Sequence, residues 1–301
     1  MGSIRSILTA TALGTAVLGL AAISSHAQES KPAAPAGGAQ DKAAQDKSTS
    51  PFGGMSEEEF AKLHTLKPED TSPTKGTMVD LPDGSKAYLA LPEGWKPGGA
   101  ALVVIHEWWG LNSHIKHWAD RFTTTGRAAL AVDLYEGKTA TNPKDAGQMM
   151  RSVDEKKAIA TMLAGLAYLK SDPKIAAGKR GSIGWCFGGG MSLQLAINAP
   201  DLDACVMYYG RPVNDPNELK KIKAPLLGNF AKKDQSIPPE AVEVFERGLK
   251  AAGVNAIINE YDANHAFANP SGQSYDAKSA TAAWAAVQAF LDKNLPVKTG
   301  A

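Results

Sequence analysis

The amino-acid sequence predicts an α/β fold in which helices cover both faces of a mostly parallel sheet. Apolar runs typical of buried strands alternate with longer stretches of helical periodicity along the chain. Such alternation favours parallel strands joined by helical crossovers. A chain of 301 residues, 44% of them hydrophobic, is also long enough to bury one large core.

Short apolar runs predict the strands. The run 101–105 reads Ala-Leu-Val-Val-Ile, as expected for a strand covered on both faces. Asp83-Gly84 is a hairpin signal between the first two runs. The predicted strands are 77–81, 86–91, 101–105, 128–132, 180–185, 203–209, 224–230 and 254–261.

Apolar residues spaced three and four apart predict helices between these strands. The stretch 153–169 is the clearest amphipathic example. The predicted helices are 114–125, 153–169, 188–197, 239–252 and 274–295. In such sheets ligands bind beyond the carboxyl ends of the strands, so functional residues are expected there.

Residues 1–27 are predicted to be a signal peptide that directs export, to the periplasm or outside the cell. Arg5 supplies the positive charge, an uncharged apolar run spans 8–23, and Ser25-His26-Ala27 matches a cleavage site. The run is shorter than the roughly 20 residues of a membrane-spanning helix, which favours cleavage over a permanent anchor. Residues 28–55 are predicted to be a flexible linker rich in Ala, Pro, Gly and Lys, and 56–301 a single α/β domain.

The charges nearly cancel, with 32 basic and 31 acidic side chains and a formal net charge of +1. No overall field attracts a polyanion, so nucleic acid is not an expected partner. A small molecule is the expected partner, no stable membrane span is expected after cleavage, and a monomer is compatible with the sequence.

The strongest functional motif is Gly184-Trp-Cys-Phe-Gly-Gly-Gly190, which follows a predicted strand and opens a predicted helix. This is the pattern of a nucleophile elbow with Cys186 as the nucleophile. The N–H of Phe187 would point at a developing oxyanion. A buried structural cysteine or a phosphate-binding turn is the competing interpretation, although no Lys-Ser/Thr pair follows as in a Walker motif.

A cysteine nucleophile needs a base, and the base needs an orienting carboxylate. Asp234 and His265 each lie just beyond a predicted strand, after the cysteine in the chain. Either residue alone is more typical of a solvated loop. Together they give the order nucleophile, acid, histidine that α/β-hydrolase triads follow.

These motifs resemble those of the dienelactone hydrolase family of α/β-hydrolases, over roughly residues 77–294. The resemblance implies an α/β-hydrolase fold, Cys186 as nucleophile, His265 as general base and acid, and Asp234 as the residue that orients the imidazole. It also implies that Glu107, in the segment Ile105-His-Glu-Trp-Trp-Gly110, controls the ionisation of the thiol. The N–H of Trp108 would join that of Phe187 in the oxyanion hole.

The resemblance implies hydrolysis of small carboxylic esters or lactones without a cofactor. The arginines with which the family holds a lactone carboxylate are replaced here, by Gly137 and Lys138 in one loop and by Asn269 after the histidine. Trp109, Tyr135 and Lys138 are expected to line the substrate pocket. A broad short-chain carboxylesterase and a non-catalytic binding protein that keeps the fold remain alternatives.

Other features carry weaker predictions. His106-Glu107 begins like a zinc-binding helix, but Gly110 stands where the second histidine would be, so no metal site is predicted. His114 and His117 are expected at the surface. Cys205 is expected in the core, and a disulfide between it and Cys186 is disfavoured because the elbow should turn Cys186 away.

Overall fold

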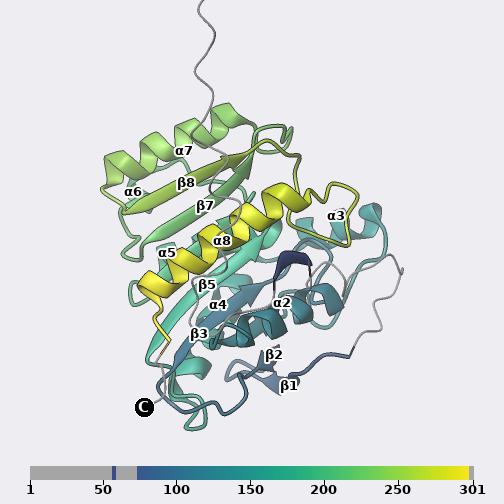
Figure 1. Ribbon diagram of the computed structural model, residues 1–301, viewed down its shortest axis with the longest axis vertical. Coiled ribbons are helices and arrows are strands. Elements are labelled where there is room, and N and C mark those ends of the chain that lie inside the picture. The colour runs from purple at the N-terminus through teal and green to yellow at the C-terminus, as the bar shows by residue number, and fades with distance from the viewer. Residues whose placement is uncertain (1–55, 59–72, 298–301) are drawn as a thin grey trace, which may run out of the picture. The chain divides into compact units, whose positions relative to one another are not determined.

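The structure, a computed structural model, describes residues 56–58 and 73–297 (Figure 1). The predicted signal peptide, 1–27, and the predicted linker, 28–55, lie outside the described residues. No helix within the described part is long and apolar enough to cross a membrane.

An eight-stranded sheet forms the centre of the fold, in the order β1-β2-β4-β3-β5-β6-β7-β8. Strand β2 is antiparallel to β1 and to β4, and all the remaining pairs are parallel. The predicted mostly parallel sheet is therefore confirmed. The strands are β1 (Thr77–Asp80), β2 (Lys86–Ala90), β3 (Ala100–Ile105), β4 (Ala128–Val132), β5 (Lys179–Trp185), β6 (Ala204–Tyr208), β7 (Leu226–Ala231) and β8 (Ala256–Tyr261).

Helices cover both faces of this sheet, as predicted, and each face has its own apolar core. Helices α2 and α8 pack with one set of strand side chains, whereas α4, α5 and α7 pack with the other. Figure 1 shows α8 lying across the sheet on the same side as α2. The helices are α2 (Ser113–Thr123), α3 (Pro143–Arg151), α4 (Glu155–Ser171), α5 (Phe187–Asn198), α6 (Pro216–Leu219), α7 (Pro239–Ala252) and α8 (Ala277–Asn294).

Two of the helices listed above, α3 and α6, are absent from the sequence prediction. Both start at a proline preceded by a side chain that caps the helix: Asn142 before Pro143 and Asp215 before Pro216. A capping residue followed by proline is a local start signal that apolar periodicity does not detect, because α3 is mostly exposed and α6 has four residues.

The two histidines expected at the surface are buried, so that prediction is wrong. His114 is 5% exposed and His117 2% exposed. Both lie on the face of α2 that packs against the core, and the ring of His114 lies 6.4 Å from that of Trp118. Cys205 is fully buried in β6, as predicted, and both cysteines are free thiols.

Candidate active site

Cys186 occupies a sharp turn between β5 and α5, with φ 54° and ψ −117°. A Cβ at Gly184 would lie 2.1 Å from the carbonyl oxygen of Gly188, and one at Gly188 would lie 2.3 Å from that of Ile105. These contacts explain why glycines flank the turn at both positions. The turn leaves the thiol partly exposed at the first turn of α5.

Asp234 and His265 form a hydrogen bond of 2.5 Å between Oδ2 and Nδ1. The other carboxylate oxygen of Asp234 accepts the N–H groups of Ser236 (2.8 Å) and Ile237 (3.0 Å). Burial alone would raise the pKa of Asp234, but the bonds from His265 and these amides outweigh it and lower the pKa. The carboxylate is therefore ionised and held in one orientation against the imidazole.

The imidazole of His265 faces Cys186. Because Nδ1 is bonded to Asp234, Nε2 is the nitrogen left for the thiol. Burial would lower the pKa of His265, but the hydrogen bond to Asp234 and the proximity of Cys186 outweigh it and raise the pKa to about 10. The ring also packs against Tyr209, at 5.0 Å between centroids.

Glu107 lies just past β3 with only 2% of its surface exposed. Burial raises the pKa of this carboxyl group to about 7, although the charge of His265 and a hydrogen bond from Asn269 lower it. The Nδ2 of Asn269 lies 2.6 Å from Oε2 of Glu107. Glu107 and Cys186 both lie near the hydroxyl of Tyr209, whose pKa is raised chiefly by burial.

His106, the neighbour of Glu107, is a structural residue. Its Nδ1 lies 2.6 Å from the carbonyl oxygen of Glu107, and its Nε2 accepts the N–H of Leu134 at 3.1 Å. Because one ring nitrogen must accept and the other donate, the ring is neutral, and burial lowers its pKa. His106 thus fixes the backbone on which Glu107 stands.

A cavity of about 1000 Å³ opens beside Cys186. Seven of the residues predicted from the sequence contribute to this site: Cys186, His265, Glu107, Trp108, Trp109 and Phe187 line the cavity, and Asp234 lies behind His265. Among the described residues no group of three or more His, Cys, Asp or Glu is arranged to hold a metal ion.

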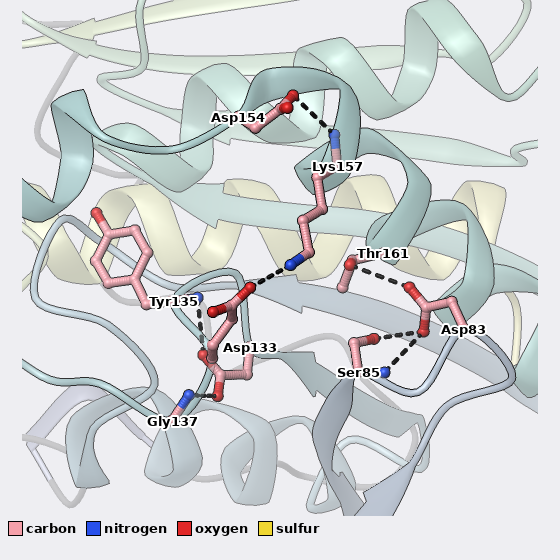
Figure 2. A network of polar contacts seen from close by, with 9 residues as sticks. Asp83, Ser85, Asp133, Tyr135, Gly137, Asp154, Lys157 and Thr161 are labelled. Atoms are coloured by element: carbon pink, nitrogen blue, oxygen red, sulfur yellow. Dashed lines mark hydrogen bonds and ion pairs between the residues drawn. The ribbon is translucent and has the colours of Figure 1, made fainter.

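Tyr135 and Lys138, predicted to line the same pocket, line a second cavity of about 740 Å³ instead. Asp133 accepts the N–H groups of Tyr135 and Gly137 and so fixes the loop, as Figure 2 shows. The ring of Tyr135 packs against those of His106 (4.6 Å) and Phe187 (5.7 Å), which buries it beneath the elbow. Lys138 therefore lies outside the cavity that contains Cys186.

Residues 85–295 match the dienelactone hydrolase family. The chain belongs to this family. It is 36% identical to "Protein usf" of Aquifex pyrophilus over 73% of this chain and 99% of that one. It is 32% identical to a protein of Aquifex aeolicus, provisionally named carboxymethylenebutenolidase, over 69% of this chain and 94% of that one.

A solved structure supports the same assignment. A provisionally named dienelactone hydrolase of Klebsiella pneumoniae superposes with a TM-score of 0.66 and 26% identity, over 74% of this chain and all of that one. The chain thus has the α/β-hydrolase fold, and its relatives indicate that it is an ester or lactone hydrolase.

Several residues of this dienelactone hydrolase-family site were not recognised from the sequence, among them two arginines and a tyrosine. Tyr209 and Arg211 follow β6, and Arg151 ends α3; all three line the cavity with Cys186. Neither arginine forms an ion pair with any residue of the described part of the chain. Position is the signal for Tyr209 and Arg211: β6 neighbours β5 in a parallel sheet, so residues just beyond both strands lie close together.

Proposed function

We propose that this chain is an exported cysteine hydrolase of small carboxylic esters or lactones, with Cys186 as its nucleophile. The observation that carries the proposal is the position of Cys186 at a strained elbow, in a cavity that it lines together with a His265 that Asp234 orients. A cationic imidazole beside the sulfur is the environment in which cysteine acts as a thiolate nucleophile.

In the first half of the reaction, the sulfur of Cys186 forms a bond to the carbonyl carbon, and the carbonyl π electrons move to oxygen. The N–H groups of Phe187 and Trp108 stabilise this oxyanion. The carbon–oxygen single bond to the leaving group then breaks, and Nε2 of His265 gives its proton to the departing alkoxide. A thioester of Cys186 remains.

In the second half, Nε2 of His265 accepts a proton from water, and the hydroxide oxygen attacks the thioester carbonyl. Collapse of the second tetrahedral intermediate releases the acid and restores the Cys186 sulfur. Glu107, raised to a pKa of about 7 by burial, is proposed to control the charge state of the thiol.

Hydrolysis of activated short-chain esters, followed with Cys186→Ala, tests this proposal against a non-catalytic binding protein. We expect the variant to lose turnover while keeping the wild-type unfolding temperature. Cys205→Ala is the matched control, because it removes the other free thiol, within the core, and should stay active. Equal activity of Cys186→Ala and the wild type would overturn the nucleophile, and no hydrolysis by the wild type would favour a binding role.

A panel of lactones and neutral esters separates a lactone-specific enzyme from a broad carboxylesterase.

The proposal of export rests on Arg5, the apolar run 8–23 and Ser25-His26-Ala27. N-terminal sequencing of the mature protein should begin at Gln28; an intact Met1 terminus in the cell envelope would contradict cleavage.

A further inference from the structure

Glu57 lies outside the stretch that matches the family, residues 85–295, yet its side chain is buried in the hydrolase domain. One carboxylate oxygen lies 2.8 Å from Nη1 of Arg121, on α2, whose guanidinium is fully buried. The other accepts the hydroxyl of Tyr275 at 2.9 Å. A single carboxylate therefore joins α2 to the segment that precedes α8.

The Arg121 side of this contact is a rigid anchor. The guanidinium lies 3.8 Å from the centroid of the Trp284 ring of α8 and 5.0 Å from that of Trp118. Burial lowers the pKa of Arg121, and the charge of Glu57 opposes this effect. A charge held in this way between aromatic rings gives the carboxylate a fixed position.

The Tyr275 side leads to the active-site cavity. The N–H of Tyr275 donates to Gly272 (3.3 Å), and that of Gly272 donates to Asn269 (3.0 Å). Asn269, Gly272, Gln273 and Ser274 all line the cavity that contains Cys186. This segment, 269–275, is therefore one wall of the cavity.

Asn269 connects this wall segment to the carboxyl group of Glu107. Its side-chain oxygen accepts the N–H of Ser271 at 2.8 Å, and its amide donates to Glu107 at 2.6 Å. The hydrogen bond from Ser271 therefore fixes the orientation of the Asn269 amide, and this amide donates its own hydrogen bond to Glu107. Glu57 binds Tyr275 at the other end of that segment, so it contacts the wall without touching the residues of the site.

We propose that Glu57 is a positioning residue for the hydrolase site: it holds the 269–275 wall through Tyr275, and thereby the Asn269–Glu107 contact. The proposal rests on the proposed function for its kinetic consequence. Glu57, which precedes the family domain in the chain, then helps to set the geometry of the site.

Tyr275→Phe tests the proposal with little risk to folding, because it removes the bond to the wall and leaves the Arg121–Glu57 pair intact. Glu57→Gln is the second variant, since it keeps the shape and removes the charge. Asp292→Asn is the matched control: it weakens the pair of the buried Arg127 with Asp292, at 2.6 Å, near the opposite end of α8 from the cavity.

Three measurements are made on each full-length variant: kcat and KM for an activated ester, the rate of Cys186 alkylation by iodoacetamide from pH 5 to 9, and the unfolding temperature. For Tyr275→Phe we expect kcat/KM to fall about three- to tenfold, mostly in kcat. The midpoint of its alkylation profile should also shift. Glu57→Gln should change kcat/KM and the alkylation midpoint in the same direction as Tyr275→Phe does. Asp292→Asn should change the unfolding temperature alone.

Wild-type kinetics and a wild-type alkylation profile in both Tyr275→Phe and Glu57→Gln would overturn the proposal, whatever happens to their unfolding temperatures. The same changes in Asp292→Asn would overturn it too, because they would reflect general loosening. Alkylation needs no ester, so a shifted profile in a chain without hydrolase activity would refute the proposed function and leave the coupling standing.

Discussion

Replacing Glu107 with glutamine should make the protein more stable above pH 7 and leave its stability unchanged near pH 4. Burial raises the pKa of this carboxyl from 4.5 to about 7 in the folded state. Between these values the unfolded chain has already ionised Glu107, whereas the folded chain holds it protonated. Folded-state stability therefore falls as pH rises through this range, and the full penalty is present above pH 7.

The rise from 4.5 to about 7 corresponds to about 3 kcal/mol of unfolding free energy. Glutamine has nearly the same shape, carries no charge at any pH, and its oxygen can still accept the amide of Asn269. The variant should thus gain about 3 kcal/mol over the wild type at pH 8 and almost nothing at pH 4.

Urea unfolding of both proteins at pH 4, 6 and 8, followed by tryptophan fluorescence and circular dichroism, measures this difference. Subtracting the wild-type value at each pH removes the contributions of the groups that do not interact with Glu107. Glu155→Gln is the control, because this carboxylate lines the same cavity but is exposed. A Glu107→Gln difference that is the same at pH 4 and pH 8 would refute the reasoning.

Three further outcomes follow from the site. Asp234→Asn should lower kcat about a hundredfold or more and lower the pKa of His265, seen as a shift in the pH–rate profile, because the carboxylate orients and stabilises the imidazolium. Gly188→Ala should cost about 2 kcal/mol or more in urea unfolding, whereas Gly190→Ala, whose Cβ would meet its nearest neighbours at 3.4 Å, should be tolerated. Equal effects would contradict the clash. Arg211→Ala should raise KM about threefold or more for an ester bearing a carboxylate and leave that for its neutral analogue unchanged; parallel changes would exclude a charge contact.

The fold, and the gathering of the candidate site residues at one edge of the sheet, could be predicted because their signals are local. Strands β3, β4 and β6 are buried along their whole length and read as continuous apolar runs. Cys186 can be recognised from the glycines that its backbone turn requires. Asp234 and His265 can be recognised because they follow it in the chain in the order acid, then histidine. Each lies beyond the carboxyl end of a strand, which a parallel sheet brings to one edge.

The remaining features depend on contacts between distant segments. Nothing near His117 in the chain indicates that α2 turns this residue inward. Tyr135 follows β4, as the motif suggests. Its ring packs against that of Phe187, however, and so lies outside the cavity that contains Cys186. Glu57 meets Arg121 64 residues later and Tyr275 218 residues later, a separation at which no sequence spacing predicts contact.

Strained backbone gathers around the proposed nucleophile, and its location explains how the site keeps its shape. Cys186, Tyr209 and Ala266 have φ values of 54°, 34° and 63°, a region that costs non-glycine residues about 1–3 kcal/mol each. Two of them are secured across the sheet: the N–H of Cys186 donates to Tyr208, and that of Tyr209 donates to Asn229, at 3.0 and 2.8 Å. The turns after β5 and β6 thus each rest on the next strand. A substitution that shifts β6 or β7 should therefore reach the thiol through the backbone, even where no side chain connects them.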